Sequence, residues 1–114
     1  MVKPAKTREI EVDEDAEGRC RFADWFDGLD ARTAAKVTTA ITRLERGLGD
    51  LKRIGDGVTE LRIDWGPGLR VYFGENAGTL VILLCRGTKR RQQKDIDRAK
   101  LLWSEYRERK SRGS

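Results

Sequence analysis

The chain has 114 residues, of which 38% are hydrophobic and 38% are charged, and its mean hydropathy is −0.67. This length allows one domain with a real core but not two, and the apolar residues fall in periodic blocks, which argues against disorder. No apolar run approaches the roughly 18 residues of a transmembrane helix, and the first ten residues lack the apolar region of a signal peptide. We therefore expect one cytoplasmic domain over residues 1–110 and a frayed tail at 111–114.

The basic residues are concentrated at the C-terminal end. Residues 86–114 contain 11 Lys/Arg and 4 Asp/Glu, a balance of +7, whereas residues 1–85 contain 13 and 15, a balance of −2. This asymmetry points to a polyanionic partner such as nucleic acid, although surface cations that only keep a small protein soluble give the same composition. The chain has no histidine, and Cys20 and Cys85 do not have the spacing of metal ligands, so we expect no metal and no other cofactor.

The N-terminal half predicts one strand followed by two helices. Thr7–Val12 alternates weakly and carries charges, as expected of an edge strand. Apolar stripes at helical spacing predict a short helix over Phe22–Leu29 and a second helix from Ala31 to Gly47, with Asp30 as the N-cap of the second. Two helices joined this closely are expected to form a pair on one face of a sheet. Asp50–Gly57 is expected to be a connection.

The stretch Val58–Phe73 predicts a β-hairpin. Apolar and polar residues alternate in two runs that a Gly-Pro-Gly turn separates, which is typical of a hairpin with one buried face. If the loop is those three residues, Asp64 lies opposite Arg70, and Arg62 lies opposite Tyr72, on the polar face. A slip of one residue would exchange the two faces.

A third strand and a long helix complete the prediction. Leu80–Cys85 is apolar without a break, so we expect a central strand that is covered on both faces. A final helix is expected from about Gln92 to Arg109. Its predicted buried stripe consists of Ile96, Ala99, Leu102, Trp103 and Tyr106. The order β-α-α-β-β-β-α predicts an α+β fold in which an N-terminal helix pair and a C-terminal helix accompany a small antiparallel sheet.

Two runs of this sequence carry a family resemblance. TELRIDWGPGLRVYFGE and LVILLCRGTKRRQQKDIDRAK, in this order, closely resemble toxins of bacterial type II toxin–antitoxin modules. The subgroup is the HigB-like addiction module killer proteins of the RelE/ParE superfamily. The upstream run FADWFDGLDARTAAKVTTAITRLERGLGDLKRIGDGVTELR resembles the same subgroup, so the similarity covers nearly the whole chain from about Arg19. The fold that the resemblance implies agrees with the one that periodicity predicts.

The resemblance also implies functions and partners. Most members of the superfamily are ribosome-dependent mRNA endonucleases (mRNA interferases), which inhibit translation, whereas the ParE branch poisons DNA gyrase without catalysis. HigB-like toxins pair with a helix-turn-helix, HigA-like antitoxin, and the complex binds operator DNA. A basic, non-toxic nucleic-acid-binding protein is the third alternative. An antitoxin segment lying over Arg62, Arg70 and the Lys89–Arg91 loop would neutralise this cationic cluster.

Metal-independent RNA cleavage needs a base for the 2′-hydroxyl, a stabiliser of the charge on phosphorus and an acid for the leaving oxygen. Some HigB-like members use histidines, and this chain has none. An arginine can bind phosphate through two hydrogen bonds but stays protonated, and Tyr or Lys would need its pKa lowered from about 10 to act as a base at neutral pH. The candidates for catalysis are Arg62, Arg70, Tyr72 and Lys89, and those for RNA binding are Arg86, Arg90, Arg91 and Lys94.

Each candidate also has a structural explanation. The charged hairpin residues are compatible with cross-strand pairs on a solvated face, and Tyr72 with a packing residue whose hydroxyl is wet. The Lys89–Arg91 loop is compatible with a solvated start of the last helix, although three cations there oppose the helix dipole unless an anion binds. The residues favour a functional role for Arg70 and for this loop, and leave the two explanations of Arg62 level.

Overall fold

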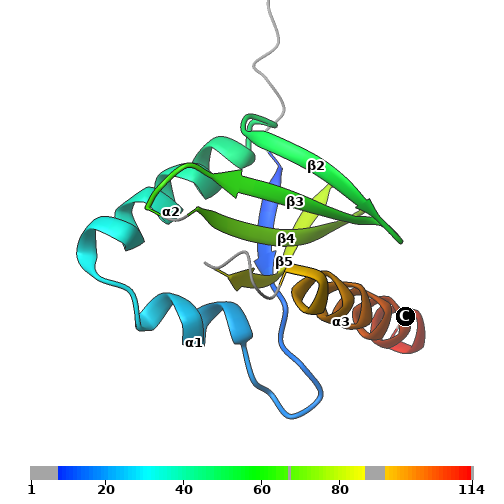
Figure 1. Ribbon diagram of the computed structural model, residues 1–114. Helices are drawn as coiled ribbons and strands as arrows, with labels where there is room; N and C mark the ends of the chain where they lie inside the picture. Colours follow the sequence, from blue (N-terminus) through cyan, green and yellow to red (C-terminus); the bar gives the residue numbers. More distant parts are fainter. Residues whose placement is uncertain (1–7, 67, 87–91, 114) are drawn as a thin grey trace, which may run out of the picture.

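The computed structural model describes residues 8–66, 68–86 and 92–113, with only the backbone described for Cys85 and Arg86. A five-stranded sheet lies between two helical layers (Figure 1). The elements in chain order are β1 (Glu9–Val12), α1 (Arg21–Asp27), α2 (Ala31–Leu44), β2 (Asp50–Gly55), β3 (Val58–Ile63), β4 (Leu69–Asn76), β5 (Thr79–Arg86) and α3 (Gln92–Gly113). The predicted α+β class, with one strand and a helix pair before the other strands and one helix after them, is confirmed.

The sheet has the order β1-β5-β4-β3-β2, and its neighbours are antiparallel except for the parallel pair β1 and β5. The predicted edge strand is therefore found as β1. The prediction of an antiparallel sheet holds for β2 to β5 and is wrong for the pair β1 and β5. The expected connection over Asp50–Gly57 is also wrong, because it contains the strand β2. Asp56 (φ 55°) and Gly57 (φ 83°) form a two-residue turn between β2 and β3. Positive φ at both positions is the conformation that twisted hairpins favour.

The register of the central hairpin differs from the prediction by two residues. Arg62 lies opposite Arg70, and Glu60 lies opposite Tyr72. The connection runs from Asp64 to Gly68, five residues instead of three, which moves the pairing while leaving each side chain on its predicted face. The expected pairs Asp64–Arg70 and Arg62–Tyr72 are therefore wrong, and the assignment of faces is confirmed.

The helix boundaries show local capping chemistry. The Asp30 side chain accepts a hydrogen bond from the Thr33 backbone N–H at 2.8 Å, so the predicted N-cap of α2 is confirmed. The α2 helix ends at Leu44, before the predicted end, and Gly47 follows with φ 75°. The α3 helix continues to Gly113, so the described part of the expected frayed tail is helical.

Two hydrophobic clusters hold the layers together. On one face, α1 and α2 pack over residues such as Leu61, Val71 and Ile82. On the other face, the predicted stripe of α3 packs over residues such as Tyr72 and Leu83. Both faces of β5 are thus covered, as its unbroken apolar sequence predicted. The polar face of the hairpin therefore lies partly under α3, so the explanation of its charged residues as pairs on a solvated face does not hold for the whole face.

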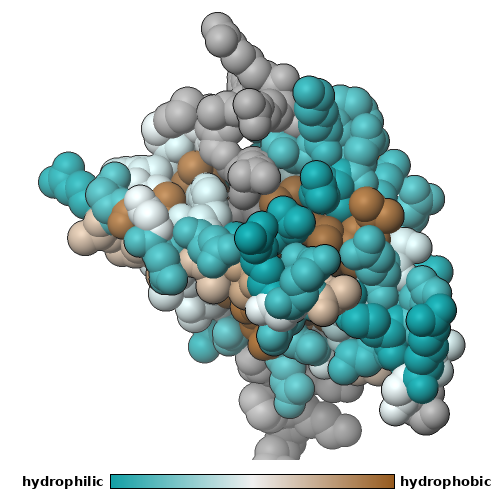
Figure 2. Space-filling view, turned by 90° about the horizontal axis from the view of Figure 1, so that it is seen from below, coloured by the Kyte–Doolittle hydropathy of each residue, from teal (hydrophilic) through white to brown (hydrophobic). Residues whose placement is uncertain are grey.

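One face of the molecule shows how polar and apolar residues are distributed over the surface. Seen from below, most of it is hydrophilic, with apolar residues in separate groups (Figure 2). None of the described helices is long and apolar enough to cross a membrane.

Candidate functional site

A row of arginines crosses three neighbouring strands. The register places Arg62 of β3 directly opposite Arg70 of β4, and Arg70 directly opposite Arg86 of β5. Like charges that face each other across strands are destabilising, so such a row requires a compensating anion. The structure supplies one carboxylate from the same face.

That carboxylate belongs to Glu60, which is completely buried two residues before Arg62 on β3. Its Oε1 accepts hydrogen bonds from Arg70 Nε at 2.9 Å and from Arg62 Nε at 3.3 Å. The Arg70 side chain is 12% exposed and that of Arg62 is 43% exposed. Within the described part of the chain, the terminal guanidinium nitrogens of both arginines make no hydrogen bond. Glu60 thus orients the pair and leaves these donors for a ligand.

Tyr72 lies directly opposite Glu60 and is completely buried under α3. Burial raises the pKa of Tyr72 to about 12, and the Glu60 carboxylate adds to this increase, while Arg70 opposes it. Its hydroxyl and the Oε2 atom of Glu60 have no hydrogen-bond partner among the described residues. The sequence-based scheme requires a lowered pKa for Tyr72 to act as a base, and the structure shows the reverse because burial outweighs the cations.

Two acidic residues of this region, Glu60 and Asp95, were not among the candidates. Glu60 is part of the same polar alternation as Arg62, so its position on this face was evident, but its burial was not. Asp95 is buried in the first turn of α3, and its charge also raises the pKa of Tyr72. An acid in a first turn is usually explained by the helix dipole alone, so the sequence carries no separate signal for it.

The remaining candidates are only partly placed. Lys94 is exposed near the start of α3. Lys89, Arg90 and Arg91 lie outside the described residues, and for Arg86 only the strand position is described. The structure therefore brings together Arg62, Arg70 and Tyr72, around an unforeseen Glu60. In residues 8–66, 68–86 and 92–113 there is no group of three or more Cys, Asp or Glu side chains that could hold a metal ion.

Comparison with known proteins identifies the family. Residues 24–103 match the family described as phage-derived protein Gp49-like (DUF891). The chain belongs to this Gp49-like family. The family is toxin-like and of the RelE/HigB type. The matched region spans the arginine pair, Glu60, Tyr72 and Asp95, so the whole described site is part of the Gp49-like sequence.

A relative of this chain occurs in Haemophilus influenzae. The relative, which bears the name "Uncharacterized protein", is 50% identical to this chain over 86 residues. The aligned region covers 74% of this chain and 87% of the relative. No solved protein structure matches the chain.

Proposed function

We propose that this Gp49-like protein is the toxin of a type II toxin–antitoxin module, and that it is a HigB-like, ribosome-dependent mRNA endonuclease of the cytoplasm. The observation that carries the proposal is the directly opposed pair Arg62 and Arg70, oriented by the buried carboxylate of Glu60. Two guanidinium groups held side by side, with their terminal nitrogens unengaged by described residues, suit a phosphate group. The toxin-like type of the family favours messenger RNA as the source of that phosphate.

The chemistry follows from these residues. The 2′-oxygen of the RNA forms a bond to phosphorus while the bond from phosphorus to the 5′-oxygen breaks. Arg62 and Arg70 bind the phosphate oxygens and stabilise the charge that develops on them. The proton of the 2′-hydroxyl goes to a base, and the 5′-oxygen receives a proton from an acid.

The acid and base roles are more restricted than the sequence suggested. Arginine stays protonated and is no base. Tyr72 is protonated at neutral pH and completely buried, so in this conformation it is a packing residue beneath α3 and does not contact RNA. Lys89 remains the proposed base, and the basic segment from Arg86 to Lys94 remains the proposed grip on RNA. The ribosome positions the message.

The proposed partner is a cognate helix-turn-helix antitoxin, which neutralises the toxin and carries it to operator DNA. A poison needs a neutralising partner in the cell that makes it, and the basic C-terminal quarter suits an acidic segment of such a partner.

Mapping of mRNA ends in a cell-free translation reaction tests the proposal. We expect the protein to create new 5′ ends only on message that is being translated. Arg62→Ala is the decisive variant, because Arg62 is 43% exposed and its loss perturbs the fold less than loss of Arg70, which is 12% exposed and supports Glu60. Removing one such charge stabiliser lowers the cleavage rate by about 100-fold or more. Arg98→Ala, at an exposed position of α3, is the matched control and keeps full activity.

The other outcomes are informative. Intact message with unimpaired translation refutes the endonuclease, and a supercoiling assay on DNA gyrase is then the next measurement. Cleavage of naked RNA at the same rate refutes the dependence on ribosomes. An Arg62→Ala variant with wild-type cleavage refutes the assignment of the arginine pair.

A further inference from the structure

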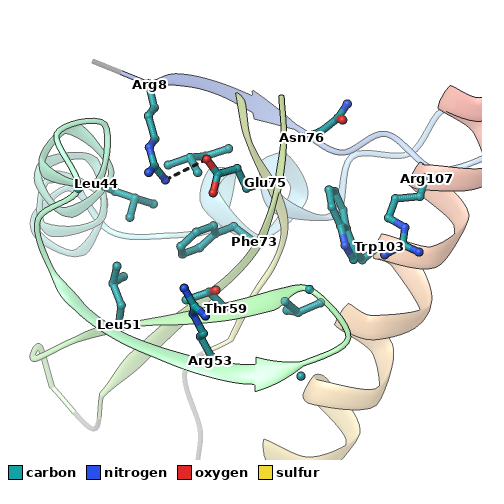
Figure 3. A pocket seen from close by; sticks show the side chains of 15 residues that line it. Arg8, Leu44, Leu51, Arg53, Thr59, Phe73, Glu75, Asn76, Trp103 and Arg107 are labelled. Atoms are coloured by element: carbon teal, nitrogen blue, oxygen red, sulfur yellow. Dashed lines mark ion pairs between the residues drawn. The ribbon is translucent and has the colours of Figure 1, made fainter. Parts of the chain in front are cut away.

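A cavity of about 800 Å³ lies at the end of the β3–β4 hairpin away from the arginine row. It is lined by the start of β3 and the end of β4, whereas Arg62 and Arg70 lie near the opposite turn. Figure 3 shows the part between the C-terminal end of α2 and strand β2, which we call the α2–β2 groove. The residues that define it are Leu44, Leu51, Arg53, Thr59, Phe73 and Leu80.

The α2–β2 groove has an apolar floor and an exposed apolar rim. Leu44, Phe73 and Leu80 are buried members of the core beneath it. Leu51 of β2 is 42% exposed, and Leu48, just before β2, is 47% exposed. Among the described residues, three large apolar side chains are this exposed, and two of them are these neighbours. The surface therefore offers an apolar contact that the described residues leave open.

Strand β2 borders this groove and is an edge of the sheet. Its inner side pairs with β3, and no described strand pairs with its outer side. The pairing of Leu51 with Leu61, and of Arg53 with Thr59, places both side chains on the face of the groove. An extended segment added to this edge would satisfy the outer backbone groups and set alternate side chains against the groove.

The charges at this end of the sheet select an acidic segment. The acids Glu75 and Asp56 are already paired, with Arg8 at 3.3 Å and Lys100 at 3.7 Å. In contrast, Arg53 and Arg107, which line the same cavity, form no ion pair with described residues. Positive charges on an edge strand discourage pairing with a second positive edge, and they favour a strand of opposite charge.

We propose that the α2–β2 groove and the outer edge of β2 bind an extended acidic segment of a partner protein as an added strand, with both apolar and acidic side chains on the face that lies against the groove. This inference deepens the proposed function and rests on it for the partner's identity, which is then the antitoxin. The segment holds the toxin at the end of the sheet away from the arginine row. It therefore leaves Arg62 and Arg70 uncovered, in contrast to a segment lying over them.

A synthetic peptide tests the groove directly. The probe is a fluorescent peptide as long as the six residues of β2, with Leu, Glu and Leu at its alternate, groove-facing positions and Thr between them, because Leu51 and Arg53 lie on the same face. The control peptide has Lys in place of Glu. We expect the full-length protein to bind the acidic peptide at least about tenfold more tightly by fluorescence anisotropy, with an affinity that falls as salt rises. Hydrogen exchange should slow in β2, and β1 should be unaffected.

Variants of the protein locate the binding. Arg53→Glu and Leu51→Lys should each weaken binding at least about tenfold. Arg98→Glu makes the same change of charge at an exposed position of α3 and should leave binding unchanged, as should Arg62→Ala.

Three results overturn the proposal. These are equal binding of the two peptides, equal losses in Arg53→Glu and Arg98→Glu, and displacement of the peptide by short single-stranded RNA, which would assign the groove to nucleic acid. The mRNA-end assay is independent of this test. Peptide binding without cleavage refutes the endonuclease and supports the groove as a binding site. Cleavage without peptide binding supports the endonuclease and refutes the groove as a binding site.

Discussion

At the scale of single residues, Glu60 determines the electrostatics of the site. Its one carboxylate accepts hydrogen bonds from two arginines that face each other across two strands. The position is buried because α3 closes over this face of the sheet. The side-chain positions of Arg62 and Arg70 therefore depend on Glu60, a residue that is not expected to contact RNA itself.

We expect Glu60→Gln to destabilise the protein by about 2 kcal/mol, because it leaves two opposed arginines without a countercharge. The loss is smaller than for a fully buried ion pair, since Arg62 is 43% exposed and water screens it. Urea unfolding at pH 7 measures it. The double variant Glu60→Gln/Arg70→Gln should recover part of the loss, because the like charges then no longer face each other. Wild-type stability in Glu60→Gln would show that Glu60 does not compensate the pair.

Tyr72 gives a prediction about pH. Its folded pKa of about 12 lies above the value near 10 of an unfolded chain, so folding favours the protonated phenol. The stability that this group contributes is fully present below about pH 10 and is lost as pH rises through 12. The loss amounts to about 2 to 3 kcal/mol.

Urea unfolding between pH 8 and 12 measures this contribution, with Tyr72→Phe as the control. The variant lacks the ionisable group, so its stability should fall less steeply above pH 10. Parallel curves for the two proteins would show that the phenol is not protected by burial. At pH 7 the variant should be within about 1 kcal/mol of the wild type, because the hydroxyl has no hydrogen-bond partner among the described residues.

At the scale of elements, the contact between α3 and the sheet depends on a glycine. A Cβ atom added to Gly74 of β4 would lie 2.5–2.6 Å from atoms of the Trp103 ring. The indole packs directly on the strand backbone, and this close approach is how α3 covers the polar face of the hairpin. Gly57, at the β2–β3 turn, makes a similar close approach, 2.8 Å from a would-be Cβ to Trp103 Nε1.

We expect Gly74→Ala to lower stability by about 1 to 3 kcal/mol, because the added methyl group overpacks this contact and displaces Trp103. Thermal unfolding and tryptophan fluorescence measure the effect. Gly74→Ala combined with Trp103→Leu should be less destabilised than the sum of the two single variants, since the smaller side chain makes room. Additive losses would show that the two residues do not compete for the same space.

Strand β2 shows why one element was not predicted. The strand is only six residues long, and it contains one half-exposed leucine among mostly charged residues. Its alternation of apolar and polar residues is therefore weak. The Asp56-Gly57 pair is the available signal, because these residues favour the positive φ values of a two-residue hairpin turn. A two-residue turn at Asp56-Gly57 implies a strand on each side of it, and therefore also β2 before it.

At the scale of the whole molecule, the C-terminal half of α3 is anchored to the N-terminal strand. Arg109 Nη2 donates to Asp13 Oδ1 at 2.8 Å, and the Tyr106 hydroxyl donates to Glu11 Oε2 at 3.2 Å. Asp13 is buried, and burial raises its pKa, while the nearby Arg109 opposes the increase. Polar and charged contacts therefore link α3 to β1 and to the residue that follows it.

This anchoring decides which C-terminal deletion can test whether the protein poisons a protein target, such as DNA gyrase, without catalysis. Deleting residues 104–114 removes buried Tyr106 and the partner of Asp13, so we expect the shortened chain to unfold, and its lack of toxicity would mean little. Deleting only residues 111–114 should leave the melting temperature within a few degrees of the wild type, because the residues described there are exposed. Circular dichroism and growth assays measure both chains. If the short deletion ends growth arrest while the fold persists, the tail contacts a target, which favours a non-enzymatic poison.

The sequence by itself determined the faces of the β3–β4 hairpin, the stripes of the helices, the coverage of β5 on both sides and the toxin-like resemblance. Side-chain alternation has a period of two, so the apolar pattern of the two strands assigns Arg62 and Arg70 to one face, and a register shift of two residues leaves that assignment unchanged. Which residues stand opposite each other depends on the length of the loop at Asp64–Gly68, and the burial of Glu60 and Tyr72 depends on where α3 packs. Only the tertiary structure decided these points. The partners of Glu60 lie in its own hairpin, but the burial that raises the pKa of Tyr72 and encloses the carboxylate comes from α3, which is far along the chain.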